Sequence, residues 1–203
     1  NYGFPESHAW SFALIAYATA YLKAHHPTEF LLGLLNAQPM GFYSVASLVH
    51  DARHHGVEVR LPCLAHGCSQ CTTEETSDPA HPALRLGWQF ARGISGNTLD
   101  ALTAAAKGGS FTSIIDVVKR AGLNASDAAT LARAHAFAAW EPDCRRAVWE
   151  ARRAAGDKLP LAPAHAIVES LPMTRAATMI TASGMTGLTL PGMIELPGCR
   201  CNQ

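Results

Sequence analysis

Apolar residues recur at helical spacing along most of the chain, and this pattern predicts a mainly α-helical protein. The first helix is expected from about Ala9 to Lys23. It is apolar on nearly all sides, so other elements must cover it, either in this chain or beyond it. Ser7 is expected to cap this helix. A residue before proline avoids helical angles, so the helix should break just before Pro27, which then opens a second helix.

The later helices are shorter and are separated by turn-forming residues. A third helix is expected to begin after Ser44 and to end at Gly56. Residues 61–83 have no periodicity and are interpreted as a connector, and residues 156–172 are rich in proline and alanine, as linkers are. Further helices are expected over residues 98–107, 114–122, 125–135 and 143–155, with short strands at 57–59 and 84–86.

The net charge of the 203-residue chain is zero, which by itself argues against a nucleic-acid partner. The distribution of charge changes this interpretation. Residues 1–83 carry three basic and seven acidic side chains, whereas residues 84–153 carry ten basic and six acidic ones. The middle of the chain is therefore the part expected to meet phosphate.

The N-terminal residues do not resemble a signal peptide, because no basic segment precedes the first apolar run. That run is about 14 residues long, whereas a bilayer span needs about 20. No membrane partner is expected. The chain starts with Asn1 instead of methionine, so we expect it to begin inside a longer reading frame.

Six cysteines stand at positions 63, 68, 71, 144, 199 and 201. Nothing indicates secretion, so disulfides are not the default expectation. Cys63, His66, Cys68 and Cys71 could supply four zinc ligands, but this spacing without a second pair is a weak zinc signal. Ordinary loop thiols are favoured, no metal site is predicted, and a small zinc-stabilised structural domain stays open as an alternative.

The most specific local feature is a glycine turn between two helical segments, Gly93-Ile94-Ser95-Gly96. Glycines let a backbone pass close to phosphate, and the helix that follows offers unpaired N–H groups and a positive end. Such a turn holds the backbone and reads no bases. An ordinary glycine turn is the alternative. The candidate DNA-binding residues here are Arg92, Gly93, Ile94, Ser95, Gly96 and Asn97.

Two other groups of residues are weaker candidates for phosphate contact. A spacing of seven places Arg145 and Arg152 on one helical face, either to meet DNA or to be solvated. Ser7 and His8 lie at a helix start, where anions are favoured, or they are a cap and a surface histidine. No spaced aspartates suit two catalytic magnesium ions, so no catalytic residue is predicted.

Three stretches carry a family resemblance: residues 2–30 around Pro5-Glu6-Ser7-His8, residues 36–43, and residues 51–59. They resemble the fingers region of the bacterial C-family DNA polymerases, the alpha-subunit type. Replicative members have Asn-Lys-Ser-His where this chain has Pro-Glu-Ser-His, which is similar to the error-prone, ImuC-like branch. The resemblance continues through the turn at Gly93 and a weaker second repeat from Ala121 to Phe137, but residues 61–70 and 196–203 depart from it.

The resemblance implies a helical fingers segment followed by a tandem helix-hairpin-helix unit with a few short strands. It assigns residues 1–60 to the end of the fingers, 61–83 to a connector, 84–155 to the DNA-binding unit, and 156–203 to a linker and a truncated lead-in to an oligonucleotide-binding domain. Ser7 and His8 would then lie near the incoming nucleotide, and residues 92–97 would hold the DNA backbone.

The resemblance also implies an activity for the intact protein. It would be an error-prone, translesion DNA polymerase in the bacterial cytoplasm, and it would use magnesium, dNTPs and primer–template DNA. A sliding clamp and damage-response proteins are further expected partners. The catalytic aspartates would precede residue 1, so the fragment alone is not expected to polymerise. A free-standing helix-hairpin-helix module is the alternative.

Overall fold

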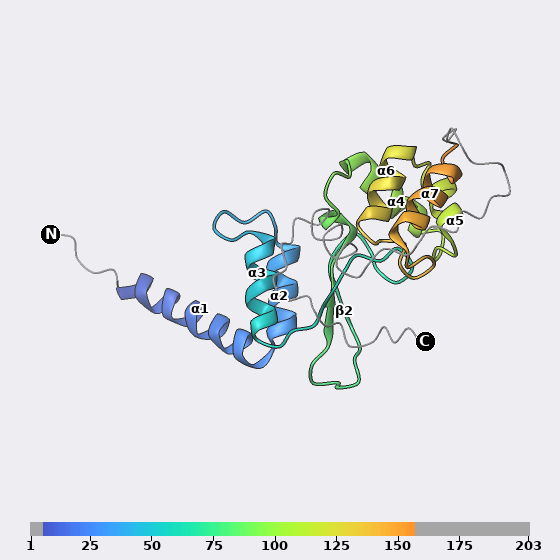
Figure 1. Ribbon diagram of the computed structural model, residues 1–203. Coiled ribbons are helices and arrows are strands. Elements are labelled where there is room, and N and C mark those ends of the chain that lie inside the picture. The colour runs from blue at the N-terminus through green and yellow to red at the C-terminus, as the bar shows by residue number, and fades with distance from the viewer. Residues whose placement is uncertain (1–5, 157–203) are drawn as a thin grey trace. The chain divides into compact units, whose positions relative to one another are not determined.

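The computed structural model describes residues 6–156, and these form seven α-helices, one short 3-10 helix and a three-stranded sheet. The expected mainly α fold with a few short strands is confirmed. The chain divides into two compact units, the first made of Asn1–Arg60 and Thr73–Leu84 and the second of Leu61–Thr72 and Arg85–Gln203 (Figure 1). Residues 2–5 of the first resembling stretch, residues 157–203 of the expected linker and lead-in, and with them Cys199 and Cys201, lie outside the described residues.

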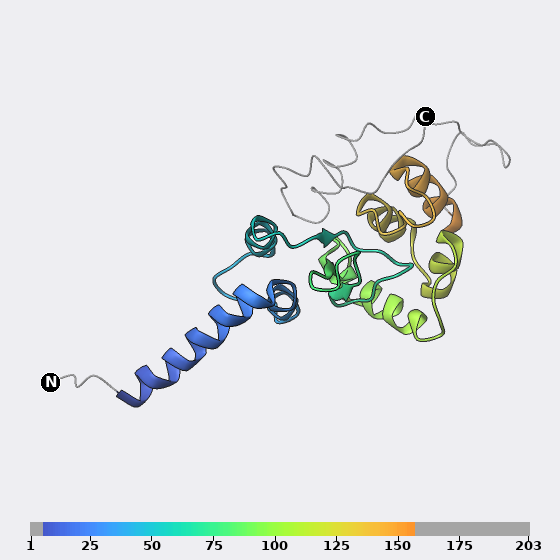
Figure 2. The same cartoon turned by 90° about the horizontal axis from the view of Figure 1, so that it is seen from below.

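The first helix of unit one, α1 (Glu6–His25), buries none of its residues. Its large apolar side chains are exposed all around the helix, and Figure 2 shows α1 running away from the other helices of this unit. Ser7 lies inside α1, so its expected role as the cap is wrong. An acidic residue is favoured in a first helical turn, and Glu6 extends the helix past Ser7.

The next two helices, α2 (Pro27–Asn36) and α3 (Val45–His54), pack on each other through buried leucine, valine and alanine side chains. Pro27 is the first residue of α2, as expected. The Ser44 side chain caps α3 by accepting a hydrogen bond from the Ser47 N–H at 3.1 Å, which also confirms the expectation. Local chemistry at these two starts therefore sets the helix boundaries.

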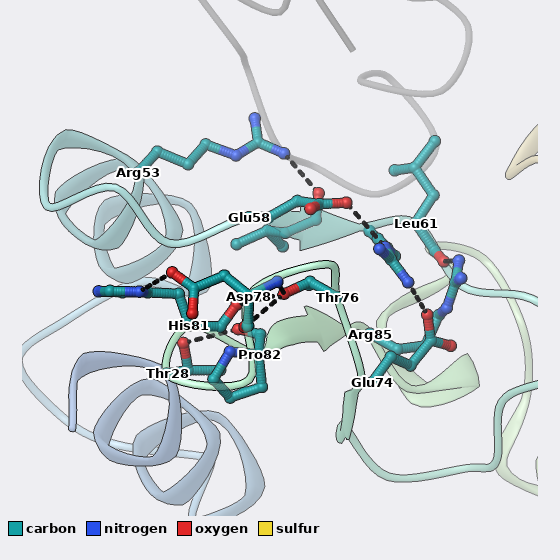
Figure 3. A network of polar contacts seen from close by, with 12 residues as sticks. Thr28, Arg53, Glu58, Leu61, Glu74, Thr76, Asp78, His81, Pro82 and Arg85 are labelled. Atoms are coloured by element: carbon teal, nitrogen blue, oxygen red, sulfur yellow. Dashed lines mark hydrogen bonds and ion pairs between the residues drawn. The ribbon is translucent and has the colours of Figure 1, made fainter. Parts of the chain in front are cut away.

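The small sheet contains β1 (Val59–Arg60), β2 (Thr72–Glu74) and β3 (Ala83–Arg85) in the order β1-β3-β2. Arg60 joins it across the strands, with its guanidinium 2.7 Å from a carboxylate oxygen of Glu58 and 2.6 Å from one of Glu74. Figure 3 labels the two glutamates and marks these contacts with dashed lines. The hydrogen bonds that its guanidinium donates to these two carboxylates raise the pKa of Arg60. The strands expected at residues 57–59 and 84–86 are shifted by one or two positions, and β2 was not expected because its threonines show no apolar alternation.

The second unit is a helical cluster built around one hydrophobic core (Figure 1). Its elements are the 3-10 helix η1 (Trp88–Phe90), α4 (Gly96–Ala106), α5 (Ile114–Ala121), α6 (Ala125–Arg133) and α7 (Cys144–Ala154). All four α-helices lie within about two residues of their expected bounds. The largest fully buried side chains of this core are Leu64, Trp88, Leu102, Ile114, Val117, Leu131 and Phe137.

Part of the segment expected to be a connector contributes to this core. Cys63 and Cys71 are buried, and the Trp88 indole N–H donates to the Cys63 carbonyl at 2.9 Å. A Cβ added to Gly87 would lie 2.3 Å from the Ser69 carbonyl oxygen, so only glycine permits this approach. The loop is therefore packed against the chain at Gly87 and Trp88.

Candidate nucleic-acid interface

The first hairpin, residues 91–96, connects η1 to α4. Gly93 has a φ of +92°, a left-handed conformation that disfavours any other residue. Ile94 is half-buried and packs on the hydrophobic core, which anchors the turn. Ser95 caps α4, with its hydroxyl accepting from the Thr98 N–H at 3.1 Å. The residues Arg92, Gly93, Ser95, Gly96 and Asn97 are all exposed.

The backbone N–H groups of residues 93–97 donate to no acceptor within the described part of the chain. A Cβ added to Gly96 would meet nothing within 4 Å, so the space in front of the first helical turn is open. Unpaired N–H groups at an exposed helix start favour an anion. The arrangement therefore has the chemistry of a phosphate-binding turn.

A second hairpin joins α5 to α6 and repeats the first residue by residue. Gly122 has a φ of +61°, Leu123 is buried in the core, and Asn124 caps α6 by accepting from the Asp127 N–H at 2.8 Å. These three positions correspond to the glycine, the apolar anchor and the cap of the first hairpin. One difference is clear: the N–H groups of Gly122 and Leu123 both donate to the Val118 carbonyl. The second hairpin therefore has fewer amides left to offer.

The arginines of α7 do not share one environment. Asp143 caps the helix, with its carboxylate accepting from the N–H groups of Arg145 and Arg146 at 2.8 and 3.0 Å. The Arg145 side chain is exposed, whereas Arg152 is half-buried and has a contact of its own. Arg145 and Arg152, which their spacing of seven residues placed on one helical face, therefore differ in exposure. Three arginines of α7 are exposed, Arg145, Arg146 and Arg153.

Ser7 and His8 lie in the first turns of α1, and both are exposed. The imidazole of His8 contacts the ring of Phe12, with their centroids 4.4 Å apart. The Ser7 carbonyl accepts from the Ser11 hydroxyl at 3.0 Å, as helix geometry favours. Both side chains are accessible, and their expected place near a nucleotide stays a prediction.

The described residues contain no group of three or more His, Cys, Asp or Glu side chains that could hold a metal ion. Cys63, His66, Cys68 and Cys71, the residues considered for a zinc site, are not gathered into such a group. In that loop Cys63 and Cys71 are buried, whereas Cys68 is exposed, and burial raises the pKa of Cys71 to about 11. Among the described helices, none has both the length and the apolar character to cross a bilayer.

One set of residues at this surface was missed by the sequence analysis. Thr98 and Asp127 each lie three positions after a helix cap, and the Thr98 hydroxyl donates to the Asp127 carboxylate at 2.6 Å. The signal was present in the sequence, because a capping residue followed three positions later by a polar side chain marks a helix start. It gave no indication that the two starts meet.

Comparison with known proteins agrees with this geometry. Residues 56–147 match the family described as helix-hairpin-helix motif. The chain is 41% identical to error-prone DNA polymerase 1 of Agrobacterium fabrum, over 94% of this chain and 19% of that protein. It is 42% identical to the error-prone DNA polymerase of Rhodopirellula baltica, over 94% of this chain and 17% of that protein, and 43% identical to that of an Anaeromyxobacter species, over 95% and 18%. The chain spans about a fifth of the length of these curated relatives, and it is homologous to the corresponding segment of these error-prone DNA polymerases.

Proposed function

We propose that this chain is the segment of an error-prone DNA polymerase that holds the sugar–phosphate backbone of primer–template DNA. One observation carries the proposal: the N–H groups of residues 93–97, a stretch that is exposed except for the half-buried Ile94, have no internal acceptor among the described residues. It lies inside the region that matches the helix-hairpin-helix family.

The contact is electrostatic and independent of sequence. The amides of the first hairpin and the positive end of α4 receive a phosphate, while Arg92 adds a full charge beside them. Hydrogen bonds to phosphate fix position and carry no base information. A translesion polymerase must hold damaged and undamaged duplex alike, and a backbone grip of this kind suits that requirement.

The remaining assignments follow from the family. In the intact polymerase, residues 1–60 form the end of the fingers, with Ser7 and His8 beside the incoming dNTP, and residues 84–155 form the DNA-binding unit. Residues 61–83 and 156–203 connect these parts to each other and to an oligonucleotide-binding domain. The magnesium ions and the catalytic carboxylates belong to other parts of the polymerase. A cytoplasmic location, a sliding clamp and damage-response partners belong to the same proposal.

Replacement of Gly96 by valine tests the hairpin directly. The added side chain has room in the fold, but it stands where a phosphate would approach the amides. We expect the variant to bind a fluorescein-labelled duplex about tenfold more weakly than the parent chain does. Anisotropy titrations at salt concentrations between about 50 and 200 mM measure both affinities. Gly33→Val is the matched control, because Gly33 lies in α2 with no atom within 4 Å of an added Cβ.

A second variant tests the arginines of α7. Arg145→Gln together with Arg153→Gln removes two exposed charges. Each lost contact with phosphate should reduce the salt slope, which is the steepness of log affinity against log salt concentration, by about one. Equal binding by Gly96→Val and the parent chain would exclude the first hairpin as the grip. An unchanged salt slope in the arginine variant would show that the exposed arginines of α7 are solvated and do not contact DNA.

A further inference from the structure

The caps of the two hairpin helices are joined by one continuous set of hydrogen bonds. The Thr98 hydroxyl donates to Asp127 at 2.6 Å, and the Asn124 side-chain amide donates to the same carboxylate oxygen at 3.0 Å. Because Thr98 donates to Asp127, the Ser95 hydroxyl must donate to Thr98, across 2.9 Å. Each of these four residues is a cap or lies three positions after one.

The network relates equivalent positions of the two hairpins. Ser95 and Asn124 are the caps of α4 and α6, and Thr98 and Asp127 are the third residues of those helices. The bridge therefore joins the same position in both repeats, although Thr98 and Asp127 are 29 residues apart in the chain. The first turn also runs close to α6, since a Cβ added to Gly93 would lie 3.6 Å from the Thr130 methyl group.

We propose that Asp127 is a positioning residue that fixes the two hairpins relative to each other, so that they hold the DNA backbone as one rigid unit. The proposal rests on the proposed DNA-binding function and assigns a role within it. Asp127 does not contact DNA in this scheme. Its carboxylate orients the amides of residues 93–97 through Thr98, and orients α6 through Asn124.

The chemistry of the bridge suits a positioning role. Thr98 is 7% exposed, and Asp127 is half-buried, so water competes weakly for their hydrogen bond. A hydrogen bond to an ionised carboxylate is shorter and stronger than a neutral one. The carboxylate also lies at two helix starts, where negative charge is favoured. A turn that holds phosphate through backbone amides needs such support, because a small displacement of the turn misdirects several donors together.

Three variants at the bridge separate its role from that of the rest of the fold. Thr98→Val keeps the shape of the side chain and removes the donor to Asp127, and Asp127→Ala removes the acceptor. Asp127→Asn keeps an oxygen that accepts from Thr98 while it removes the charge. Ser113→Ala is the matched control, because Ser113 caps α5 by accepting from the Asp116 N–H at 3.1 Å and belongs to neither hairpin.

The assay is duplex binding by the 203-residue chain as a function of salt, with circular dichroism to verify folding. We expect Thr98→Val and Asp127→Ala to bind about tenfold more weakly, with a salt slope lower by about one or two. Asp127→Asn should retain the affinity of the parent chain or exceed it, because a negative charge near the phosphate is gone. Ser113→Ala should retain both affinity and slope. Loss of slope is the specific result, since a general loss of stability would leave the number of phosphate contacts in the folded molecules unchanged.

Other results would overturn the inference. If Thr98→Val and Asp127→Ala keep the affinity and slope of the parent chain, the bridge does not position the hairpins, although the proposed function stands. If the parent chain itself does not bind duplex, the proposed function fails, and the role of Asp127 fails with it. Should Thr98→Val not fold, Asp127→Glu moves the carboxylate by one methylene, and unchanged binding by that variant refutes the proposal.

Discussion

Replacement of Arg120 by alanine should destabilise the second unit, because this one side chain binds backbone carbonyls at and just after the C-terminus of α4. Its guanidinium donates to the Ala105 carbonyl, to that of Gly109 at 2.8 Å and to that of Ser110 at 3.3 Å. It also lies 4.7 Å from the centre of the Phe111 ring. Carbonyls at a helix C-terminus lack partners within the helix and carry partial negative charge, so a cation there satisfies both needs.

The magnitude follows from these contacts. Each hydrogen bond contributes about 0.5–1.5 kcal/mol net, and the arginine–aromatic contact contributes about 0.5–1 kcal/mol. The side chain is 27% exposed, and the contacts are not additive, so the expected loss is about 2–4 kcal/mol. For a chain of this length, the melting temperature should fall by roughly 5–10 °C.

Urea unfolding followed by tryptophan fluorescence measures this loss, because Trp88 is buried in the same core. Arg145→Ala is the matched control, since Arg145 is an exposed arginine whose removal should cost less than about 0.5 kcal/mol. A loss below about 1 kcal/mol for Arg120→Ala would show that water replaces these contacts without penalty, which would refute the reasoning.

Two further predictions concern titration and reactivity. A hydrogen bond from the Thr112 N–H, and then the neighbouring Arg120, lower the pKa of Asp116 in the folded chain below its ordinary value of 3.8. The ionised Asp116 carboxylate therefore stabilises the fold above pH 3.8, and this stabilisation is lost as the pH falls through the lowered pKa of the folded chain. Asp116→Asn should therefore flatten the acid side of the stability curve measured by urea unfolding, and an unaltered curve would contradict this origin. Burial raises the pKa of Cys71 to about 11, whereas Cys68 is exposed, so iodoacetamide at about pH 8 should modify Cys68 well before Cys71 in fragment mass spectra. Equal modification of the two thiols would show that the loop is open.

The helix boundaries could be predicted where one residue dictates a backbone geometry. Pro27 and Ser44 marked two helix starts correctly, because a proline nitrogen and a capping hydroxyl act within one turn. Gly122 ends α5 in a left-handed conformation that glycine alone adopts readily. Ser7 failed as a cap because α1 already includes Glu6, an acidic residue of the kind favoured in a first helical turn.

The loop from Cys63 to Cys71 could not be predicted from periodicity. Its order depends on Gly87 and Trp88, which lie far along the chain and supply a close backbone approach and an indole donor. A segment without a repeating pattern is interpreted as exposed, but small apolar side chains such as cysteine fill a core without any period. Contacts of this kind are set by the tertiary fold.

The hairpins show the same division between local and non-local information. Net charge argued against DNA, and the glycine turn argued for it, because a backbone amide binds phosphate without any charge of its own. The turn at Gly93 was therefore recognisable from a few adjacent residues. The bridge between Thr98 and Asp127 was not, since each residue alone is an ordinary member of a helix start. Only the packing of α4 and α6 on one core brings these two residues together. The proposed DNA grip is built from local turns, but in our proposal it depends on a contact that no local sequence pattern reveals.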